Sequence, residues 1–242
     1  MRAVPLDDPR AFPPAPPADL DDAEAIAAND WEAFRQVAQM RDHWSRPGWY
    51  PGRHAYYWML TFPDEPELLA MAHRCQSAIA PLGLDLIPDD GLHITLTRIA
   101  EAGTPRARLD ALAEHAAEQV PTAFELSVGP LAGSPGAVRF SVAPWRPLVE
   151  LHAVLAHANL RTGLDVGTPT ARFRPHLGIA YSNRVRPAAQ VIEVVADQRS
   201  TARVHTRVVS AELVELRREG SVYTWDVLHR VPLRRPLAVG QG

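Results

Sequence analysis

Two short segments that repeat one pattern constrain the fold of this chain more than any other feature of its sequence. Residues 91–96 and residues 174–179 each place a histidine inside a run that alternates polar and apolar side chains. Such alternation is typical of a β-strand with one buried face. The sequence therefore predicts two strands, about 80 residues apart, that each present an imidazole on the face opposite the core.

The same alternation predicts which side chains accompany each histidine. Thr95 lies on the face of His93, and Arg174 and Gly178 lie on the face of His176. A lone histidine on a strand is most often structural. Two imidazoles presented by distant parts of one chain instead favour a pair of acid–base groups that meet across a cleft.

Composition excludes several kinds of site. Cys75 is the only cysteine, so an intramolecular disulfide and a zinc site built from cysteines are excluded. A content of 46% hydrophobic residues without a long apolar run indicates a soluble, globular chain of one large or two small domains. No apolar signal segment follows Met1, so we expect a cytoplasmic protein that does not bind membranes.

The charged residues also narrow the chemistry. The 25 basic residues against 28 acidic ones leave a net charge of −3, so any recognition of phosphate is local. All the basic residues are arginine, which excludes Schiff-base lysines and the lysine of a phosphate-binding P-loop. Arginine suits bidentate phosphate binding, although a bias of the coding sequence explains the same composition more simply.

The order of the expected elements indicates a mixed α/β fold with largely antiparallel sheets. Residues 1–20 are rich in proline and predict a poorly ordered or polyproline-like arm, and a helix follows over 21–42. We place a boundary at residue 50, with one domain over 51–242. Within that domain we expect strands near residues 54–62, 84–87, 92–99, 123–128, 137–142 and 172–181, helices over 66–79, 105–120, 145–161 and 187–195, and a closing hairpin of 203–216 and 221–230.

With these two histidine segments the chain resembles the 2H phosphoesterase superfamily, which includes the 2′-5′ RNA ligase-like proteins and cyclic phosphodiesterases. The mark of that superfamily is a pair of His-x-Thr/Ser-x motifs with apolar residues at each x. His93-Ile94-Thr95-Leu96 fits the motif fully. Residues 173–180 fit it in context, with proline before the second histidine, but depart from it at Gly178. The resemblance covers about residues 53–230.

The resemblance implies a bilobal, pseudo-symmetric fold in which two mostly antiparallel sheets line a central cleft and the helices lie outside. Each lobe contributes a histidine and a hydroxyl to the cleft. Members act on 2′,3′-cyclic phosphates or 2′-5′ phosphodiester bonds without a metal ion or other cofactor. The expected partner is therefore a nucleotide or an RNA end that carries such a group, and we expect a monomer.

Cyclic phosphodiester opening needs one group that takes a proton from water and one that gives a proton to the leaving ribose oxygen. His93 and His176 suit both tasks, because imidazole has an unperturbed pKa of about 6.5. Thr95 is positioned by alternation to donate a hydrogen bond to a phosphate oxygen. The sequence does not decide which histidine is the base.

Gly178 removes the matching donor from the second motif, and three interpretations compete. The backbone approaches the substrate more closely at glycine, Ser182 supplies the hydroxyl instead, or the site is weak or specialised. Further candidates for contacts with substrate are Arg98, Arg172 and Arg174 for phosphate or ribose, and Tyr181 for stacking on a base. Solvated charges and a packed aromatic ring are the alternatives for these four.

Three functions remain open on these observations. The first is a metal-independent phosphodiesterase that acts on a 2′,3′-cyclic phosphate or a 2′-5′ linkage in RNA or a small nucleotide. The second is an RNA- or nucleotide-binding protein with little or no catalysis, which Gly178 motivates. The third is reversible 2′-5′ RNA ligation, which the same two histidines would serve by microscopic reversibility.

Overall fold

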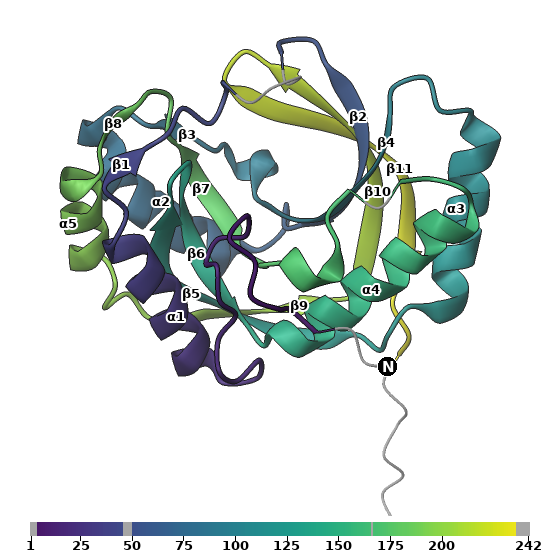
Figure 1. The fold of residues 1–242 in the computed structure, drawn as a ribbon, viewed down its shortest axis with the longest axis horizontal. Helices are drawn as coiled ribbons and strands as arrows, with labels where there is room; N and C mark the ends of the chain where they lie inside the picture. The colour runs from purple at the N-terminus through teal and green to yellow at the C-terminus, as the bar shows by residue number, and fades with distance from the viewer. Residues whose placement is uncertain (1–3, 46–49, 166, 236–242) are drawn as a thin grey trace, which may run out of the picture.

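Two antiparallel β-sheets stand on either side of the centre of the molecule in the computed structural model, which describes residues 4–45, 50–165 and 167–235 (Figure 1). The four-stranded sheet, in the order β11-β10-β2-β4, comprises β2 (His54–Thr61), β4 (His93–Glu101), β10 (Ser210–Glu219) and β11 (Val222–Pro232). The five-stranded sheet, in the order β3-β7-β6-β5-β9, comprises β3 (Asp85–Leu86), β5 (Phe124–Ser134), β6 (Ala137–Ala143), β7 (Leu177–Tyr181) and β9 (Val204–Val208).

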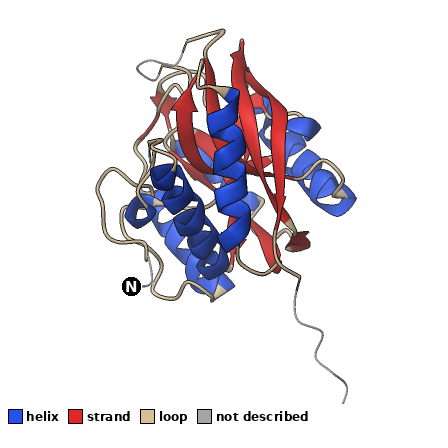
Figure 2. Ribbon diagram, turned by 90° about the vertical axis from the view of Figure 1, so that its right-hand side faces the viewer, coloured by secondary structure: helices blue, strands red, loops and turns tan. Residues whose placement is uncertain are grey.

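The helices lie outside the two sheets (Figures 1 and 2). The helices that cover the five-stranded sheet are α1 (Ala23–Arg35), α2 (Pro66–Ile79) and α5 (Ala189–Asp197). The helices that cover the four-stranded sheet are α3 (Arg106–Gln119) and α4 (Trp145–Arg161). The predicted fold class, a mixed α/β fold with two mostly antiparallel sheets around a cleft and helices outside, is confirmed.

Local sequence signals explain where several helices begin. Asp22 caps α1 by accepting hydrogen bonds from the backbone N–H groups of Glu24 and Ala25. Pro66 occupies the first turn of α2, where its missing N–H leaves no helical hydrogen bond unmade. The predicted bounds of α2 and α4 agree with the structure at both ends.

The helix predicted over residues 21–42 is too long, because α1 ends at Arg35. The next residues form β1 (Gln39–Met40), which pairs with β8 (Arg186–Pro187). This pairing holds the side chain of Met40 in the core, where it is fully buried. A tertiary contact has therefore replaced the last two turns of the expected helix.

The second histidine strand is also shorter than predicted, because β7 begins at Leu177 rather than near Arg172. Residues Thr170–Arg172 form a turn of 3₁₀-helix instead. Pro175 has no N–H to donate to a ladder, which explains why the strand starts only after it. The prediction that Arg174 lies on the strand face of His176 is therefore wrong, and His176 immediately precedes the strand.

The segment predicted as one strand over residues 203–216 is divided between the two sheets. Its first part, β9, pairs with β5, and its second part, β10, pairs with β2 and β11. Val209 lies between them and is exposed. The chain thus crosses from one sheet to the other at this residue, and the predicted hairpin is confirmed for β10 and β11.

One cluster of buried apolar side chains fills the molecule and includes residues of both sheets. Ile26 and Phe34 of α1 are fully buried in this cluster. The proline-rich arm before α1 is also attached to the body, since Leu6 N–H donates to the carbonyl of Ala171. The domain boundary at residue 50 stays a prediction. No helix in the described ranges has the length and apolar character needed to cross a membrane.

Candidate active site

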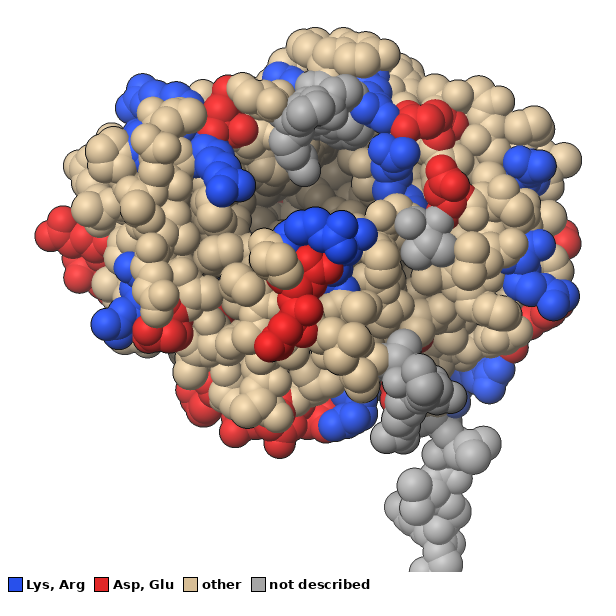
Figure 3. Space-filling view, in the orientation of Figure 1, with Lys and Arg blue, Asp and Glu red and all other residues tan. Residues whose placement is uncertain are grey.

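A cleft of about 1290 Å³ lies between the two sheets. Figure 3 shows this hollow at the centre of one face, with arginine side chains on its rim. The residues predicted as functional that line it are His93, Thr95, Arg98, Arg172, Arg174, His176, Gly178 and Tyr181. The two histidine segments, distant in the sequence, therefore meet in one cavity.

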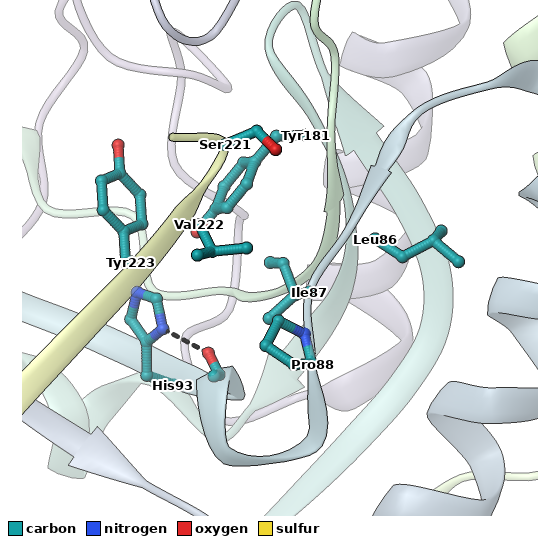
Figure 4. A pocket seen from close by; sticks show the side chains of 9 residues that line it. Leu86, Ile87, Pro88, His93, Tyr181, Ser221, Val222 and Tyr223 are labelled. Atoms are coloured by element: carbon teal, nitrogen blue, oxygen red, sulfur yellow. Dashed lines mark hydrogen bonds between the residues drawn. The ribbon is translucent and has the colours of Figure 1, made fainter. Parts of the chain in front are cut away.

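His93 is the first residue of β4 and follows the 3₁₀ turn Asp89–Gly91. Its Nδ1 lies 2.7 Å from the carbonyl oxygen of Gly91, the contact drawn as a dashed line in Figure 4. A carbonyl only accepts hydrogen bonds, so Nδ1 carries the proton and Nε2 keeps its lone pair. Trp225 approaches the His93 ring edge-on, with 5.4 Å between the centroids. This hydrogen bond thus fixes the imidazole in one tautomer, in which Nε2 can accept a proton.

His176 repeats this arrangement in the other half of the cleft. Its Nδ1 lies 2.9 Å from the carbonyl oxygen of Arg174, which is again two residues earlier in the chain. The same tautomer follows, with Nε2 unprotonated in the neutral ring. Each half therefore holds its imidazole through the backbone just before it.

Burial makes both imidazoles weaker bases than histidine in water. Burial, together with the positive charges of Arg139 and His93, lowers the pKa of His176 to about 3. Burial also lowers the pKa of His93. Both rings are therefore neutral near pH 7 in the protein without substrate. A bound phosphate group would raise both pKa values, because its negative charge stabilises the imidazolium form.

A β-bulge decides which residues of β4 face the cleft. Thr95 pairs with Met59, whereas Arg98 pairs with Tyr57, so Leu96 is an extra residue opposite β2. Residues 57 and 59 share one face of β2, and Thr95 and Arg98 consequently share the cleft face of β4. Arg98 also forms an ion pair with Glu101, with 2.7 Å between the charged atoms.

The predicted residues of β7 and beyond fall in different surroundings. Gly178 lines the cleft, and a Cβ atom on it would lie 3.1 Å from Cδ1 of Ile87. The ring of Tyr181 is stacked on His43, with 3.9 Å between the centroids. Ser182 is fully buried, its hydroxyl donates to the carbonyl of Arg184, and it is not among the residues that line the cleft. The structure therefore does not bring Ser182 to the place of the missing hydroxyl.

Arg174 holds the proline-rich arm against the edge of the cleft. Its side chain is only 6% exposed and donates hydrogen bonds to backbone carbonyls on both sides of the contact. The acceptors are the carbonyl oxygens of Leu6, Pro13, Pro14, Ala171 and Phe173, at 2.7–3.1 Å. Arg172 lies 3.5 Å from the carboxylate of Asp8 on the same arm. Both arginines therefore contact the arm as well as the cleft.

Several residues of the cleft were not identified from the sequence. They include Arg10 and Phe12 on the arm, His43, Arg139 on β6, and Tyr223 on β11. The sequence offered one signal for a functional residue, because Arg139 is a charged residue within an otherwise largely apolar strand. The structure shows that every residue of this strand is buried. The arm offered no comparable signal, because its place beside the cleft depends on contacts with residues 171–174. Within the described ranges, no three His, Cys, Asp or Glu side chains are grouped as metal ligands would be.

Comparisons with known proteins agree with this geometry. The family model described as the 2′-5′ RNA ligase superfamily matches residues 62–220. LigT of E. coli in its apo form has 17% sequence identity and a TM-score of 0.58, over 76% of this chain and 99% of that chain. The protein TT0787 of Thermus thermophilus has 19% identity and a TM-score of 0.50, over 76% and 98% of the two chains.

At these identities the solved structures show only that the fold is shared. The family model covers well over half of the chain and therefore shows the family. A comparison with curated proteins gives no match. The paired histidines, the two sheets around them and the family match lead to one conclusion. This chain belongs to the 2′-5′ RNA ligase superfamily, that is, to the 2H phosphoesterases.

Proposed function

We infer that this protein is a phosphodiesterase that hydrolyses a 2′,3′-cyclic phosphate or a 2′-5′ phosphodiester bond without a metal ion. The observation that carries this function is the matched pair of imidazoles, His93 and His176. Both rings line one cleft, and both are fixed by a hydrogen bond from Nδ1 to the preceding backbone. Superfamily membership supports phosphoesterase chemistry of this type.

The reaction needs two proton transfers that the pair can perform. One neutral imidazole takes a proton from water at Nε2 while the water oxygen forms a bond to phosphorus. The phosphorus bond to one ribose oxygen breaks, and the second imidazole, protonated at Nε2, gives that oxygen its proton. A phosphomonoester and a free ribose hydroxyl result. Thr95, which also lines the cleft, donates a hydrogen bond to a non-bridging oxygen, where negative charge accumulates.

A nucleotide or a nucleotide at an RNA end is the substrate class that these observations favour. The cleft volume of about 1290 Å³ exceeds that of a single phosphate group and accommodates a base and a ribose as well. Structures of E. coli LigT include complexes with 3′-AMP, ATP and NADP⁺. The net charge of −3 gives no general attraction to long RNA.

The test is turnover of 2′,3′-cyclic nucleotides and 2′-5′ dinucleotides in EDTA by the wild type and by two variants, His93→Ala and His176→Ala. We expect wild-type turnover to survive EDTA and each variant to lose about 10²–10⁴-fold in kcat, the usual contribution of a positioned acid or base. His205→Ala is the matched control, because His205 is an exposed histidine on β9 outside the cleft.

Other outcomes would contradict the proposal in distinct ways. Turnover that disappears in EDTA would mean that the mechanism uses a metal ion. Binding of 3′-AMP without turnover of any substrate would favour a nucleotide-binding protein. Joining of a cyclic-phosphate end to a 5′-hydroxyl end, at a rate above that of cleavage, would favour ligation.

A further inference from the structure

The two halves of the cleft differ in the groups that can stabilise a phosphate. Thr95 supplies a hydroxyl beside His93, whereas Gly178 supplies none beside His176. We propose that Arg139 replaces the missing hydroxyl and donates a hydrogen bond to the phosphate in the second half of the site. This inference rests on the proposed function, because it assigns a catalytic residue to the same reaction.

The register of the five-stranded sheet places Arg139 next to Gly178. The Cα atoms of these two residues are direct partners across β6 and β7, and both residues line the cleft. Side chains at partner positions on one face of a sheet lie about 5 Å apart at Cβ. Among the described residues, a Cβ atom on Gly178 would meet only Ile87 within 4 Å. The register therefore places the Arg139 side chain on the strand next to the position where the family motif would carry a hydroxyl.

Arg139 is rigidly held and keeps one donor unused. Its side chain is 2% exposed, and Nη2 donates to Asp30 at 3.1 Å and to the carbonyl of Phe12 at 3.3 Å. Asp30 also accepts a hydrogen bond of 2.6 Å from Ser141. Among the described residues Nε of Arg139 has no hydrogen-bond partner, although it is buried. A buried N–H without a partner is uncommon and is accounted for here by a ligand that is bound during the reaction.

The charge of Arg139 acts on the reacting groups. Its positive charge is one of the causes that lower the pKa of His176, so the guanidinium lies within electrostatic range of the imidazole. The same charge stabilises a phosphate that becomes more negative in the transition state. A hydrogen bond from a guanidinium to an anion is about twice as strong as a neutral one, which offsets the loss of the hydroxyl.

The segments that hold Arg139 lie outside the region matched by the family model. Asp30 belongs to α1 and Phe12 to the proline-rich arm, whereas the match covers residues 62–220. The arm and α1 thus have a role at the site. They fix the guanidinium next to a strand that has lost its own donor.

The first experiment combines Arg139→Gln with Gly178→Ser and measures kcat/KM for a 2′,3′-cyclic nucleotide. Arg139→Gln alone should lower kcat/KM about 10²-fold, as for one lost anion donor. Gly178→Ser alone is the reference for the double variant, since a Cβ at position 178 needs only the Cδ1 end of Ile87 to move aside. The double variant should regain at least about 10-fold over Arg139→Gln, because the new hydroxyl substitutes for the guanidinium.

A simple structural role would give a different result. If the ion pair of Arg139 with Asp30 served only the fold, Gly178→Ser would not rescue the activity of Arg139→Gln, and the two effects would add. That outcome would overturn the inference, as would activity of Arg139→Gln within about 3-fold of the wild type. Arg186→Gln is the matched control, because Nε of Arg186 is also buried without a partner among the described residues, whereas Arg186 lies outside the cleft.

The second experiment needs no variant and decides the matter if Arg139→Gln does not fold. Inorganic phosphate is added to the wild-type protein while NMR follows the Nε–H signals of Arg139 and Arg186 and the ring signals of His93 and His176. We expect the Arg139 signal to move together with both histidines, and the Arg186 signal to stay. Histidine signals that move while Arg139 does not would overturn the inference and leave the proposed function intact. A shifted Arg139 signal in a protein that turns over no substrate would instead contradict the proposed function and leave the contact of Arg139 with phosphate in place.

Discussion

The two histidines are held alike, but the chain around them is built differently. His93 begins a continuous strand, and the turn that supplies its carbonyl partner is next to it in sequence. His176 lies between the 3₁₀ turn Thr170–Arg172 and β7, and Arg174, which supplies its carbonyl partner, is fixed by the proline-rich arm. The first half of the site is therefore local in sequence, whereas the second half is assembled from distant segments.

The surroundings of the two halves differ in charge as well. The first half has a neutral hydroxyl, Thr95, and an aromatic edge from Trp225. The second half has a glycine and a buried arginine, and the charge of that arginine helps to lower the pKa of His176. Under the proposed mechanism, the two halves would stabilise the phosphate by two physical means, a hydroxyl in the first half and a guanidinium in the second.

The largest effect that tests this comparison is expected at Thr95. Thr95→Val removes the hydroxyl but keeps the shape, so kcat should fall about 10²–10³-fold while the stability of the fold changes little. Thr95→Ser keeps the hydroxyl and should retain most of the activity. Steady-state kinetics with a cyclic nucleotide, together with thermal melting of each variant, gives both quantities. Equal activity of the valine and serine variants would mean that the first half does not depend on a hydroxyl.

An effect on stability is expected at Arg174, which belongs only to the second half. Arg174→Gln cannot reproduce the buried hydrogen bonds to the carbonyls of the arm, and we expect a loss of about 3 kcal/mol in the free energy of unfolding. Urea denaturation measures this loss, and limited proteolysis of residues 4–20 reports release of the arm.

The control for that prediction is Arg172→Gln. Arg172 is 27% exposed and its ion pair with Asp8 is 3.5 Å long, so its loss should cost under about 1 kcal/mol. Similar losses of stability in the two variants would show that the arm is not anchored through Arg174. Loss of activity by Arg174→Gln without release of the arm would indicate a direct role in substrate binding.

The contrast between the halves also explains what the sequence could predict. The alternation around His93 identified the cleft face of β4 as far as Thr95, because a strand with one buried face has a period of two. The helix bounds of α2 and α4 followed from proline and from apolar spacing. These features depend on residues that are close together in the chain.

The remaining features depend on tertiary contacts. The bulge at Leu96, which turns Arg98 toward the cleft, is visible only in the register of β2 against β4. The ion pair of Arg139 with Asp30 joins residues that are 109 positions apart. The early end of α1 follows from the pairing of Met40 with Arg186. No local pattern specifies these contacts, and the ion pair of Arg139 with Asp30 belongs to the second half of the site.

The smallest expected effect is a displacement of the pH profile. The pair needs one neutral and one protonated imidazole, so activity falls below the lower apparent pKa and above the higher one. The profile of kcat/KM reports the free enzyme, where burial lowers the pKa of His176 to about 3 and also lowers the pKa of His93. Its maximum should therefore lie on the acid side of pH 6.5, the ordinary value for histidine.

The profile of kcat should reach its maximum at higher pH than that of kcat/KM, because the bound phosphate raises both pKa values. Arg139→Gln removes a positive charge that disfavours the imidazolium form of His176. The lower apparent pKa of the pair should consequently rise, and the acid limb of kcat/KM should move to higher pH. Rate measurements from about pH 2.5 to about pH 9 on both proteins test these shifts. An acid limb that does not move in the variant would mean that the charge of Arg139 does not distinguish the two halves.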